Sequence, residues 1–432
     1  MNQNKTFSGE LVLLVLFLIR EGAFSKKNYL CFLQVPFFIF ADRLYPFFCQ
    51  WHGFMSFKIE SNHNRLADTF YFIRFCVDNP LAQVKAFGDH LADYLDVPYV
   101  VPCGNGTDAL QIALMALQLQ PGNEVIVPAF TYVAAAEVIA LLGLTPVLVD
   151  VDPRTYNIDP RKIEESISRN TKAIIVVHLF GQSCDMAPIL RIAGMYHLHV
   201  VEDNAQSVGA EYTFPDGQVK KTGTMGVIGT TSFFPSKPLA CFGDGGALMT
   251  SDESLAKRIR MIANHGQEVK YHHKLIGCNS RLDTLHAAVL DVKLKYIDEF
   301  TKARQVVARR YDEGLASCEQ LILPKKSDFS THVYHQYTVQ LKPVPEYSDT
   351  AKHREALQVA LKEKGIPTMV YYPVPLQAQD AYKWMARTPG SMETAARLSN
   401  CVLSLPIHTE MTVEEQEYII DVLVKELENR KI

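Results

Sequence analysis

The sequence of 432 residues lacks the features of disulfide-rich, zinc-binding and nucleic-acid-binding proteins. Its nine cysteines have irregular spacings, with no Cys-x-x-Cys pair and no set of cysteines and histidines at zinc spacing. We therefore expect no metal site, and reduced, buried thiols as in a cytosolic protein. No long run of like charges, heptad pattern, internal repeat or low-complexity tract occurs, and the net charge is −4. Charge therefore does not indicate a nucleic-acid or membrane-surface partner.

Long apolar segments are also missing. The apolar run of residues 11–19 lies between Glu10 and Arg20 and is well short of the ~20 residues that a membrane-spanning helix needs. Lys5 is the only basic residue before the run, and no Ala-x-Ala cleavage site follows it, unlike in a signal peptide. Residues 1–78 are rich in Phe, Leu and Tyr but show no helical or strand periodicity. We expect a cytoplasmic protein with an atypical apolar segment at its start.

The part from about residue 80 to 300 has the pattern of an α/β domain. The composition, 48% hydrophobic and 21% charged, is that of a soluble globular enzyme. Short β-branched runs alternate with helical patterns, which indicates a mostly parallel sheet flanked by helices. The predicted strands are Tyr99–Pro102, Glu124–Val127, Pro146–Val149, Ala173–Val177, His199–Glu202 and Thr230–Phe234. The predicted helices are Ala109–Leu119, Val133–Leu142, Pro160–Ile167, Met186–Tyr196 and Leu255–Ala263.

From about residue 301 the pattern changes to that of a smaller α+β domain. Thr412 and Glu415 form a predicted capping box for the last helix. We therefore divide the chain into residues 1–78, a large domain of residues 79–300 and a small domain of residues 301–432. The elements predicted for the small domain are the helices Thr301–Leu315, Ala351–Glu363 and Val413–Glu428, the strand Tyr334–Leu341 and the extended segment Ile366–Leu376.

Lys237 is a candidate catalytic lysine. It follows a predicted strand in a turn marked by serine and proline, and the glycine-rich stretch Gly243–Gly246 comes next. A catalytic lysine must be partly desolvated so that its neutral amine is accessible near pH 7, and a turn at a strand's end can present it into a cleft. Glycines let backbone pass close to a cofactor. Taken alone, however, a lysine in a loop is more often an exposed surface residue.

Asp203 ends the buried strand at His199–Glu202, and Gln206 follows three residues later. A carboxylate at this end of a strand points into the crevice where α/β sheets bind ligands. An acid there can pair with the pyridine nitrogen of pyridoxal phosphate (PLP) and make the ring an electron sink, while Gln206 could contact the 3-oxygen of the ring. The ordinary alternative for Asp203 is a helix N-cap.

Three further motifs have polar or aromatic residues where a phosphate or planar ring could bind. Gly104–Ala109 leads from a strand into a helix, and small residues at a helix N-terminus suit a phosphate, although such turns also occur for packing alone. Tyr132 follows another strand and could stack on a cofactor or belong to the core. Asn279 and Arg281 open a predicted helix and could hold a phosphate or carboxylate, or simply cap the helix.

The order of these motifs resembles that of the DegT–StrS nucleotide-sugar aminotransferases, a family of fold type I PLP enzymes. The similar stretches run from VPCGNGTDALQIAL through VVEDNAQSVGAEY and TSFFPSKPLACFGDGGAL to NSRLDTLHAAVL, so the resemblance extends from about residue 80 to the C-terminus. It implies a large domain with a mostly parallel seven-stranded sheet flanked by helices and a smaller C-terminal α+β domain. It also implies a homodimer with shared active sites.

The resemblance assigns a role to each candidate residue. Lys237 would hold PLP in a Schiff base and shuttle the proton, while Asp203 pairs with the pyridine nitrogen and Gln206 with the ring hydroxyl. Tyr132 would stack on the ring. The phosphate would be held by Thr107, Asp108 and Ser232 and, from the other subunit, by Asn279.

The wording around Lys237 is similar to that of the enzymes that aminate UDP-2-acetamido-2-deoxy-3-oxo-glucuronate. Arg281 would then meet a carboxylate of sugar or glutamate, with Tyr371 and Tyr372 in the substrate pocket. The implied reaction moves an amino group from glutamate to a keto-sugar carried on a nucleotide, in cell-surface polysaccharide or related biosynthesis. Two alternatives stay open: a non-catalytic relative that binds cofactor or sugar, and a PLP enzyme with another substrate. Residues 1–78 depart from the family pattern, as a genuine extension or a misassigned start.

Overall fold

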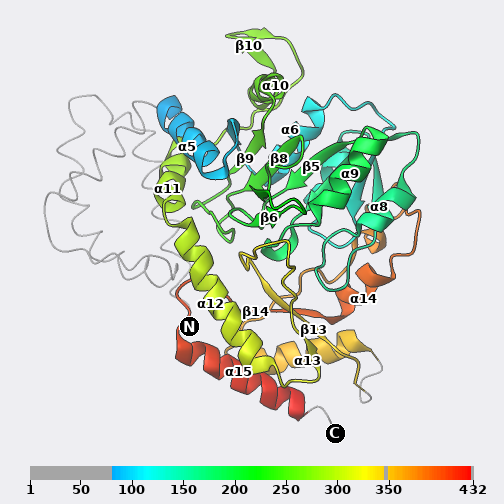
Figure 1. The fold of residues 1–432 in the computed structure, drawn as a ribbon, viewed down its shortest axis with the longest axis vertical. Helices are drawn as coiled ribbons and strands as arrows, with labels where there is room; N and C mark the ends of the chain where they lie inside the picture. Colours follow the sequence, from blue (N-terminus) through cyan, green and yellow to red (C-terminus); the bar gives the residue numbers. More distant parts are fainter. Residues whose placement is uncertain (1–79, 345–348, 430–432) are drawn as a thin grey trace, which may run out of the picture. The chain divides into compact units, whose positions relative to one another are not determined.

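The computed structural model describes residues 80–344 and 349–429, so the predicted segment of residues 1–78 lies outside the described part. The main sheet consists of β1 (Tyr99–Cys103), β2 (Glu124–Pro128), β3 (Thr145–Val149), β4 (Thr171–Val177), β5 (His199–Asp203), β8 (Ile228–Ser232) and β9 (Gly246–Thr250). Its order is β1-β9-β8-β5-β4-β2-β3. Figure 1 labels β9, β8 and β5, which follow one another in this order. The strands β8, β5, β4, β2 and β3 run parallel, and β9 is antiparallel to β8 and β1. The predicted mostly parallel seven-stranded sheet is confirmed.

Helices cover both faces of this sheet. They are α5 (Pro80–Leu95), α6 (Gly106–Ala116), α7 (Ala134–Leu141), α8 (Pro160–Ser166), α9 (Met186–Tyr196), α10 (Glu253–Ala263) and α11 (Thr284–Leu294). Because alternate strand residues face opposite sides, Val125 and Val127 pack in one cluster with α6, α7 and α10, and Ile126 packs in another with α8 and α9. A third cluster, on α5 and α11, contains Val100 and Met249. The sheet is thus buried on both faces.

Strand β9 was not predicted from the sequence. It begins at Gly246 and continues Ala-Leu-Met-Thr, a short run that directly follows the glycine-rich turn. All five residues of β9 are buried. Tertiary pairing with β8 and β1 on either side makes this run a strand, which local pattern does not reveal.

The C-terminal part has its own sheet and core. The sheet is antiparallel, with the order β12 (Leu321–Ile322), β13 (Tyr337–Leu341) and β14 (Val402–Leu405). The helices are α12 (Ile297–Leu315), α13 (Thr350–Glu363), α14 (Glu393–Cys401) and α15 (Val413–Glu428). Tyr311, Tyr337 and Leu423 lie in one buried cluster, in agreement with the predicted α+β part. The predicted domain boundary at residue 300 falls inside α12, so the division at that residue stays a prediction.

Short elements complete the described chain. They are the strands β6 (Glu211–Thr213), β7 (Val219–Lys221), β10 (Gln267–Val269) and β11 (His272–His273), and the 3₁₀ turns η1 (Leu179–Gly181) and η2 (Leu376–Ala378). No helix in the described ranges is long and apolar enough to cross a membrane. The six described cysteines form no disulfide with one another, and four of them are buried.

One strand begins later than predicted. The sequence predicts a strand at Tyr334–Leu341, but β13 starts at Tyr337. Tyr334 has a φ of 48°, in the left-handed region, which interrupts an extended strand. Instead of pairing in the sheet, the preceding residues bond to η1: the N–H of Val333 donates to the Gly181 carbonyl at 2.8 Å. This detour brings residues 333–336 to the large sheet's ligand edge.

The capping box at the start of α15 is present as predicted. The Glu415 N–H donates to Thr412 Oγ1 at 3.1 Å, and the Thr412 N–H donates to Glu415 Oε2 at 2.9 Å. We expect Thr412→Ala to lower the free energy of unfolding by about 1 kcal/mol, because the Glu415 N–H loses its side-chain acceptor. Urea denaturation measures this change. Thr412→Ser keeps the hydroxyl and serves as control; equal losses in both variants would contradict the capping role.

Candidate active site

Lys237 lies in a tight turn just after β8. Its backbone N–H donates to the Phe234 carbonyl at 2.8 Å, which closes a turn with Pro235 at the second position, where the fixed φ of proline fits. The turn is anchored by Phe233, whose side chain is fully buried and whose N–H donates to the Gly245 carbonyl at 2.7 Å. The lysine is therefore held at the carboxyl end of a central strand, where the sequence predicted it.

Asp203 is the last residue of the neighbouring strand β5. It pairs in register with Thr230 of β8, so Asp203 and Lys237 belong to the same edge of the sheet. Asp203 is 8% exposed, and its Oδ1 accepts the N–H of Ala205 at 3.0 Å. The residues that follow form a turn and not a helix, so the alternative of a helix N-cap is excluded.

The two side chains influence each other's protonation. Burial raises the pKa of Asp203, and the Ala205 N–H and the charge of Lys237 oppose this change. Burial lowers the pKa of Lys237, and the charge of Asp203 opposes that change. A desolvated amine beside a carboxylate has its neutral form accessible at lower pH than an exposed lysine, which is the property that a nucleophilic lysine needs.

Gln206 connects this edge to two other segments. Its Oε1 accepts the N–H of Phe180 at 2.8 Å, and its Nε2 donates to Tyr372 Oη at 3.1 Å. Both ends of the amide are therefore engaged with protein groups, and its predicted contact with a ring oxygen would use the second hydrogen of Nε2. Gln206 thus joins the Asp203 turn to η1 and to the segment after α13.

Four aromatic residues, Phe130, Tyr132, Tyr371 and Tyr372, form an aromatic wall beside Gln206. Tyr372 lies with its ring centroid 6.0 Å from that of Phe130 and 6.2 Å from that of Tyr132. Tyr371 is next to it, with centroids 5.8 Å apart. Tyr132 is 56% exposed, so the alternative of a core aromatic is excluded. The structure therefore brings the predicted stacking residue and both predicted substrate-pocket tyrosines together.

The start of α6 contains the turn that the sequence predicts as a phosphate site. The Asn105 side chain accepts the N–H of Asp108 at 2.8 Å, and its carbonyl accepts that of Ala109 at 3.0 Å. A helix leaves its first N–H groups without intrahelical acceptors, so those of Gly106 and Thr107 face the helix end, where the dipole is positive. These free N–H groups could donate hydrogen bonds to an anion.

Close packing places Ser232 against this turn. A Cβ on Gly106 would lie 2.7 Å from Ser232 Cβ, and a Cβ on Gly246 would lie 2.5 Å from the Asn105 carbonyl carbon. Only glycine fits at both positions. Gly246 therefore lets β9 pack directly against Asn105, and Gly106 lets Ser232 pack directly against the start of α6.

Asp108 is bonded inward and not toward the helix end. Its Oδ2 accepts the hydroxyl of Ser280 at 2.6 Å, and the Ser280 Oγ accepts the N–H of Gly104 at 2.9 Å. Ser280, which the sequence analysis did not single out, thus ties the segment before α11 to the phosphate turn. The sequence feature that could have identified Ser280 is its position between the two candidate residues Asn279 and Arg281.

The prediction that Asn279 and Arg281 open a helix was wrong. Helix α11 begins at Thr284 with Asp283 as its N-cap residue, so neither side chain opens or caps it. Asn279 instead forms an isolated antiparallel bridge with Asn264. Both residues are exposed, on either side of the buried Ser280. Within one chain they flank the phosphate turn without entering it.

A buried hydrogen bond between His178 and Glu202, next to Asp203 in the sequence, was also missed. His178 and Glu202 are fully buried, and His178 Nε2 donates to Glu202 Oε2 at 2.8 Å. The Cys184 N–H donates to His178 Nδ1 at 3.0 Å, which assigns the ring proton to Nε2. Glu202 also accepts the N–H of Gly223 at 2.9 Å. His178 directly follows strand β4, one residue beyond Val177, the register partner of Asp203, and this polar residue at a strand end was the available signal.

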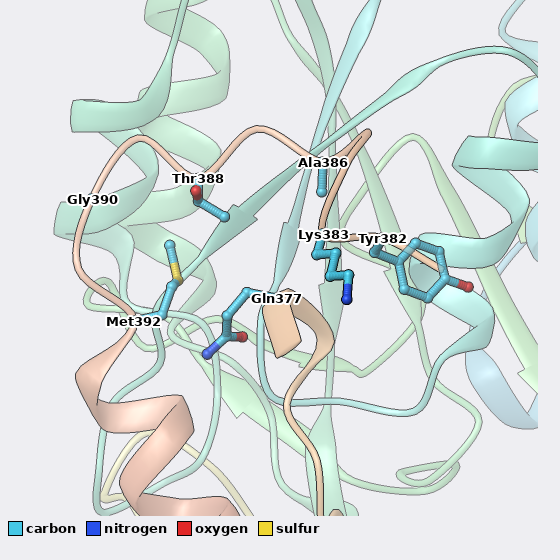
Figure 2. Close-up of a pocket in the computed structure, with 7 residues that line it drawn as sticks. All are labelled: Gln377, Tyr382, Lys383, Ala386, Thr388, Gly390 and Met392. Carbon is cyan, nitrogen blue, oxygen red and sulfur yellow. The ribbon is translucent and has the colours of Figure 1, made fainter. Parts of the chain in front are cut away.

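A separate cavity of about 220 Å³ contains none of these residues. It is lined by Gln377, Tyr382, Lys383, Ala386, Thr388, Gly390 and Met392, all from one segment of the C-terminal part (Figure 2). The only cation there, Lys383, is already paired with Asp380 at 2.6 Å. The chemistry-bearing groups therefore gather at the strand ends and not in this cavity.

Comparison with known proteins agrees with this geometry. Residues 79–424 match the DegT/DnrJ/EryC1/StrS aminotransferase family. The chain belongs to that family. It is 46% identical over 326 residues to the UDP-2-acetamido-2-deoxy-3-oxo-D-glucuronate aminotransferase of Pseudomonas aeruginosa, covering 76% of this chain and 86% of that enzyme. The predicted family and the predicted aminotransferase activity are confirmed.

Solved structures of other members share the fold. The aminotransferase from Brucella abortus has a TM-score of 0.75 at 36% identity, over 86% of this chain and 98% of that one. NtdA from Bacillus subtilis, with bound cofactor PMP, has a TM-score of 0.74 at 30% identity, over 85% of this chain and 83% of that one. The predicted fold class is thus confirmed from a second direction.

The phosphate turn provides a direct test of the site. We expect Gly106→Ala to weaken binding of PLP by about tenfold or more, because the new methyl group clashes with Ser232 and moves it away from the start of α6, which costs at least one contact to the phosphate. Fluorescence titration with PLP measures the affinity. Gly194→Ala, where an added Cβ meets nothing within 4 Å, is the matched control. Equal affinities in wild type and Gly106→Ala would rule out this turn as the phosphate site.

Proposed function

We propose that the protein is a cytoplasmic, PLP-dependent aminotransferase that moves an amino group from glutamate to a keto group of a nucleotide-linked sugar, in polysaccharide or related sugar biosynthesis. The observation that carries this proposal is the meeting of Lys237 and the buried Asp203 at one edge of a parallel sheet. Family membership and the PMP-containing relative support the cofactor.

The residues present fit this cofactor. The N–H groups of Gly106 and Thr107 and the hydroxyl of Ser232 would hold its phosphate, Tyr132 would stack on the ring, and Asp203 would face the pyridine nitrogen. The packing of Gly106 on Ser232 leaves no room for a side chain in this cradle. When bound, PLP supplies an electron-accepting ring that stabilises negative charge on the reacting carbon.

The protein's own groups then hold and move protons. Asp203 would face the ring nitrogen. Burial raises the pKa of this carboxyl, and the Ala205 N–H and the charge of Lys237 oppose the change. Lys237, with its lowered pKa, offers Nζ as the base that removes the proton from the amino donor and later returns one to the acceptor. Tyr372 and Tyr371 line the adjoining wall, where we place the sugar.

The relative from Pseudomonas aeruginosa supports the substrate class. Its name gives a UDP-linked 3-oxo-uronic acid as substrate, and 46% identity covers most of both chains. We propose a related nucleotide-linked keto-sugar for this protein. Arg281 is exposed, and its guanidinium can donate two hydrogen bonds to one carboxylate. It would bind the carboxylate of such a sugar or of glutamate.

We further propose that the active enzyme is a homodimer with shared sites. Asn279 and Arg281 are exposed in one chain, so their polar groups are available to a neighbouring chain's site. Large apolar side chains near the site are also exposed: Phe234 by 50% and Ile276 by 87%. Apolar exposure of this degree is typical of surfaces that a partner covers.

The covalent link between Lys237 and the cofactor can be tested directly. The purified protein with PLP should show a visible absorption band that borohydride abolishes, with the label fixed on Lys237, and glutamate should shift the band. Lys237→Ala should lose the band and all activity, while Lys352→Ala, an exposed lysine on α13, keeps both. Spectra and peptide mass spectrometry measure this. A colourless wild type would refute the proposal, and a band unmoved by glutamate would favour a non-catalytic relative or another substrate.

The second prediction tests site sharing. Lys237→Ala and Asn279→Ala homodimers should each be nearly inactive, whereas an equal mixture of the two should recover about a quarter of wild-type activity after subunit exchange. Half of the dimers are then mixed, and each mixed dimer has one intact site. Turnover after refolding the mixture measures the recovery, with each variant mixed with itself as control. No recovery despite confirmed exchange would contradict sites built from two chains.

A further inference from the structure

The hydrogen bond between Gln206 and Tyr372 can run in only one direction. The backbone N–H of Phe180 donates at 2.8 Å to one end of the Gln206 amide, so that end is the oxygen, Oε1. The other end is therefore the NH₂ group, which only donates, and it lies 3.1 Å from Tyr372 Oη. The Tyr372 oxygen thus accepts this bond, and its own proton points elsewhere.

The backbone around Phe180 keeps this direction fixed. Phe180 is buried, and its φ of 59° lies in the left-handed region. Its carbonyl accepts the N–H of Gln336 at 3.3 Å. The next residue, Gly181, packs so closely that a Cβ there would lie 2.9 Å from the backbone nitrogen of His335. Because the backbone is held on both sides, the Phe180 N–H is a fixed donor that sets the orientation of the buried Gln206 amide.

The Tyr372 hydroxyl keeps a proton that no described residue accepts. A phenol can donate one hydrogen bond and accept others. Among the residues that the structure describes, the bond from Gln206 is the only hydrogen bond of Tyr372 Oη. Burial raises the pKa of Tyr372, although the Gln206 bond opposes this change, so the hydroxyl is protonated near pH 7. Its proton is therefore available to an acceptor on a ligand.

The 3-oxygen of the cofactor ring is not that acceptor. In the proposed function, the second hydrogen of Gln206 Nε2 meets this ring oxygen. The two hydrogens of an amide nitrogen diverge by about 120°, so two acceptors bonded to them lie about 5 Å apart. Tyr372 Oη is one of the two acceptors, and at this distance it cannot bond to the other. The Tyr372 proton is thus left for a substrate.

The surroundings of Tyr372 suit a sugar better than glutamate. Proteins usually bind carboxylates with charged donors such as arginine, whereas a neutral hydroxyl suits the neutral hydroxyl and keto oxygens of a sugar. The aromatic wall adds apolar surface, and Tyr132, with its ring centroid 6.2 Å from that of Tyr372, is more than half exposed. An apolar surface with a few placed polar groups is typical of small-molecule sites.

We propose that Tyr372 determines specificity for the keto-sugar: its hydroxyl donates a hydrogen bond to an oxygen of the sugar, and Gln206 is the positioning residue that directs this proton. The inference rests on the proposed function and deepens it by naming the group that recognises the sugar. A carboxylate at position 206 would accept from both the Phe180 N–H and the Tyr372 hydroxyl. Gln206→Glu should therefore turn the Tyr372 proton away from the sugar.

Binding to the inactivated enzyme tests this bond without turnover. Borohydride fixes the cofactor on Lys237, and calorimetry then measures the Kd of UDP and of UDP-2-acetamido-2-deoxyglucuronate, which has a hydroxyl in place of a 3-oxo group. We expect Tyr372→Phe to weaken binding of the UDP-sugar about tenfold, through loss of one hydrogen bond, and to leave UDP binding unchanged. Tyr382→Phe, which changes a buried tyrosine of the separate cavity, is the matched control and should alter neither Kd.

A double-mutant cycle with Gln206→Glu separates the direction of the bond from packing. Gln206→Glu adds a charge and also removes the Tyr372 proton from the sugar, whereas in the Tyr372→Phe background it can only add the charge. Its effect on the Kd of the UDP-sugar should therefore be about tenfold smaller in that background. A purely structural role of Tyr372 would give additive effects. Should Gln206→Glu not fold, the contrast between UDP-sugar and UDP in Tyr372→Phe decides alone.

The outcomes distinguish this inference from the proposed function. An unchanged Kd of the UDP-sugar in Tyr372→Phe, an equal weakening of UDP, or additive effects in the cycle would overturn the inference alone. The glutamate concentration that half-shifts the visible band should be the same in Tyr372→Phe and wild type; a tenfold rise would assign the hydroxyl to the amino donor instead. A wild type that binds no UDP-sugar would refute the proposed substrate class and this inference with it.

Discussion

The burial of two opposite charges at one sheet edge is the constraint on which the site depends. Taking a carboxylate or an amine out of water costs free energy unless the group has a partner. The charges of Asp203 and Lys237 offset part of this cost for each other. The charges offset the cost of burial only in part, because burial remains the largest cause of the pKa shift of both groups. The lowered pKa of Lys237 makes its neutral amine accessible at a lower pH than that of an exposed lysine.

The sheet's topology produces this pair. Strands β5 and β8 are parallel neighbours, so residues at their carboxyl ends meet although 34 positions separate Asp203 from Lys237 in the sequence. The antiparallel strand β9 then returns the chain beneath α6, where Gly246 and Gly106 allow direct packing. The phosphate end and the amine end of the site are therefore fixed by one continuous stretch of chain.

The C-terminal part is connected to this edge at two places. Tyr372 accepts a hydrogen bond from Gln206, and residues 333–336 bond to η1, which Gln206 also holds. Gln206 is thus a junction between the cofactor edge and both segments that come from beyond α12. This arrangement explains why β13 starts late: the backbone groups that would extend the strand are used at the active site instead.

Much of the fold was determined by local sequence. The periodicity of apolar residues placed six of the main strands, and the helices Met186–Tyr196 and Val413–Glu428 have the predicted bounds, because each carries a complete local signal. The candidate residues Lys237, Asp203 and Thr107 could be proposed for the same reason, as each lies at a junction that strand and turn patterns mark.

Other features were decided only by the tertiary structure. Strand β9 exists because β8 and β1 pair with it, and Ser280 belongs to the site because it bonds to Asp108 across 172 positions. Residues 334–336 were predicted as part of a strand, and only their contacts with η1 take them out of the sheet. The sequence by itself determined which residues could do this chemistry, since residue type and local pattern are encoded there. Their meeting depends on long-range pairing and close packing, which no local pattern contains.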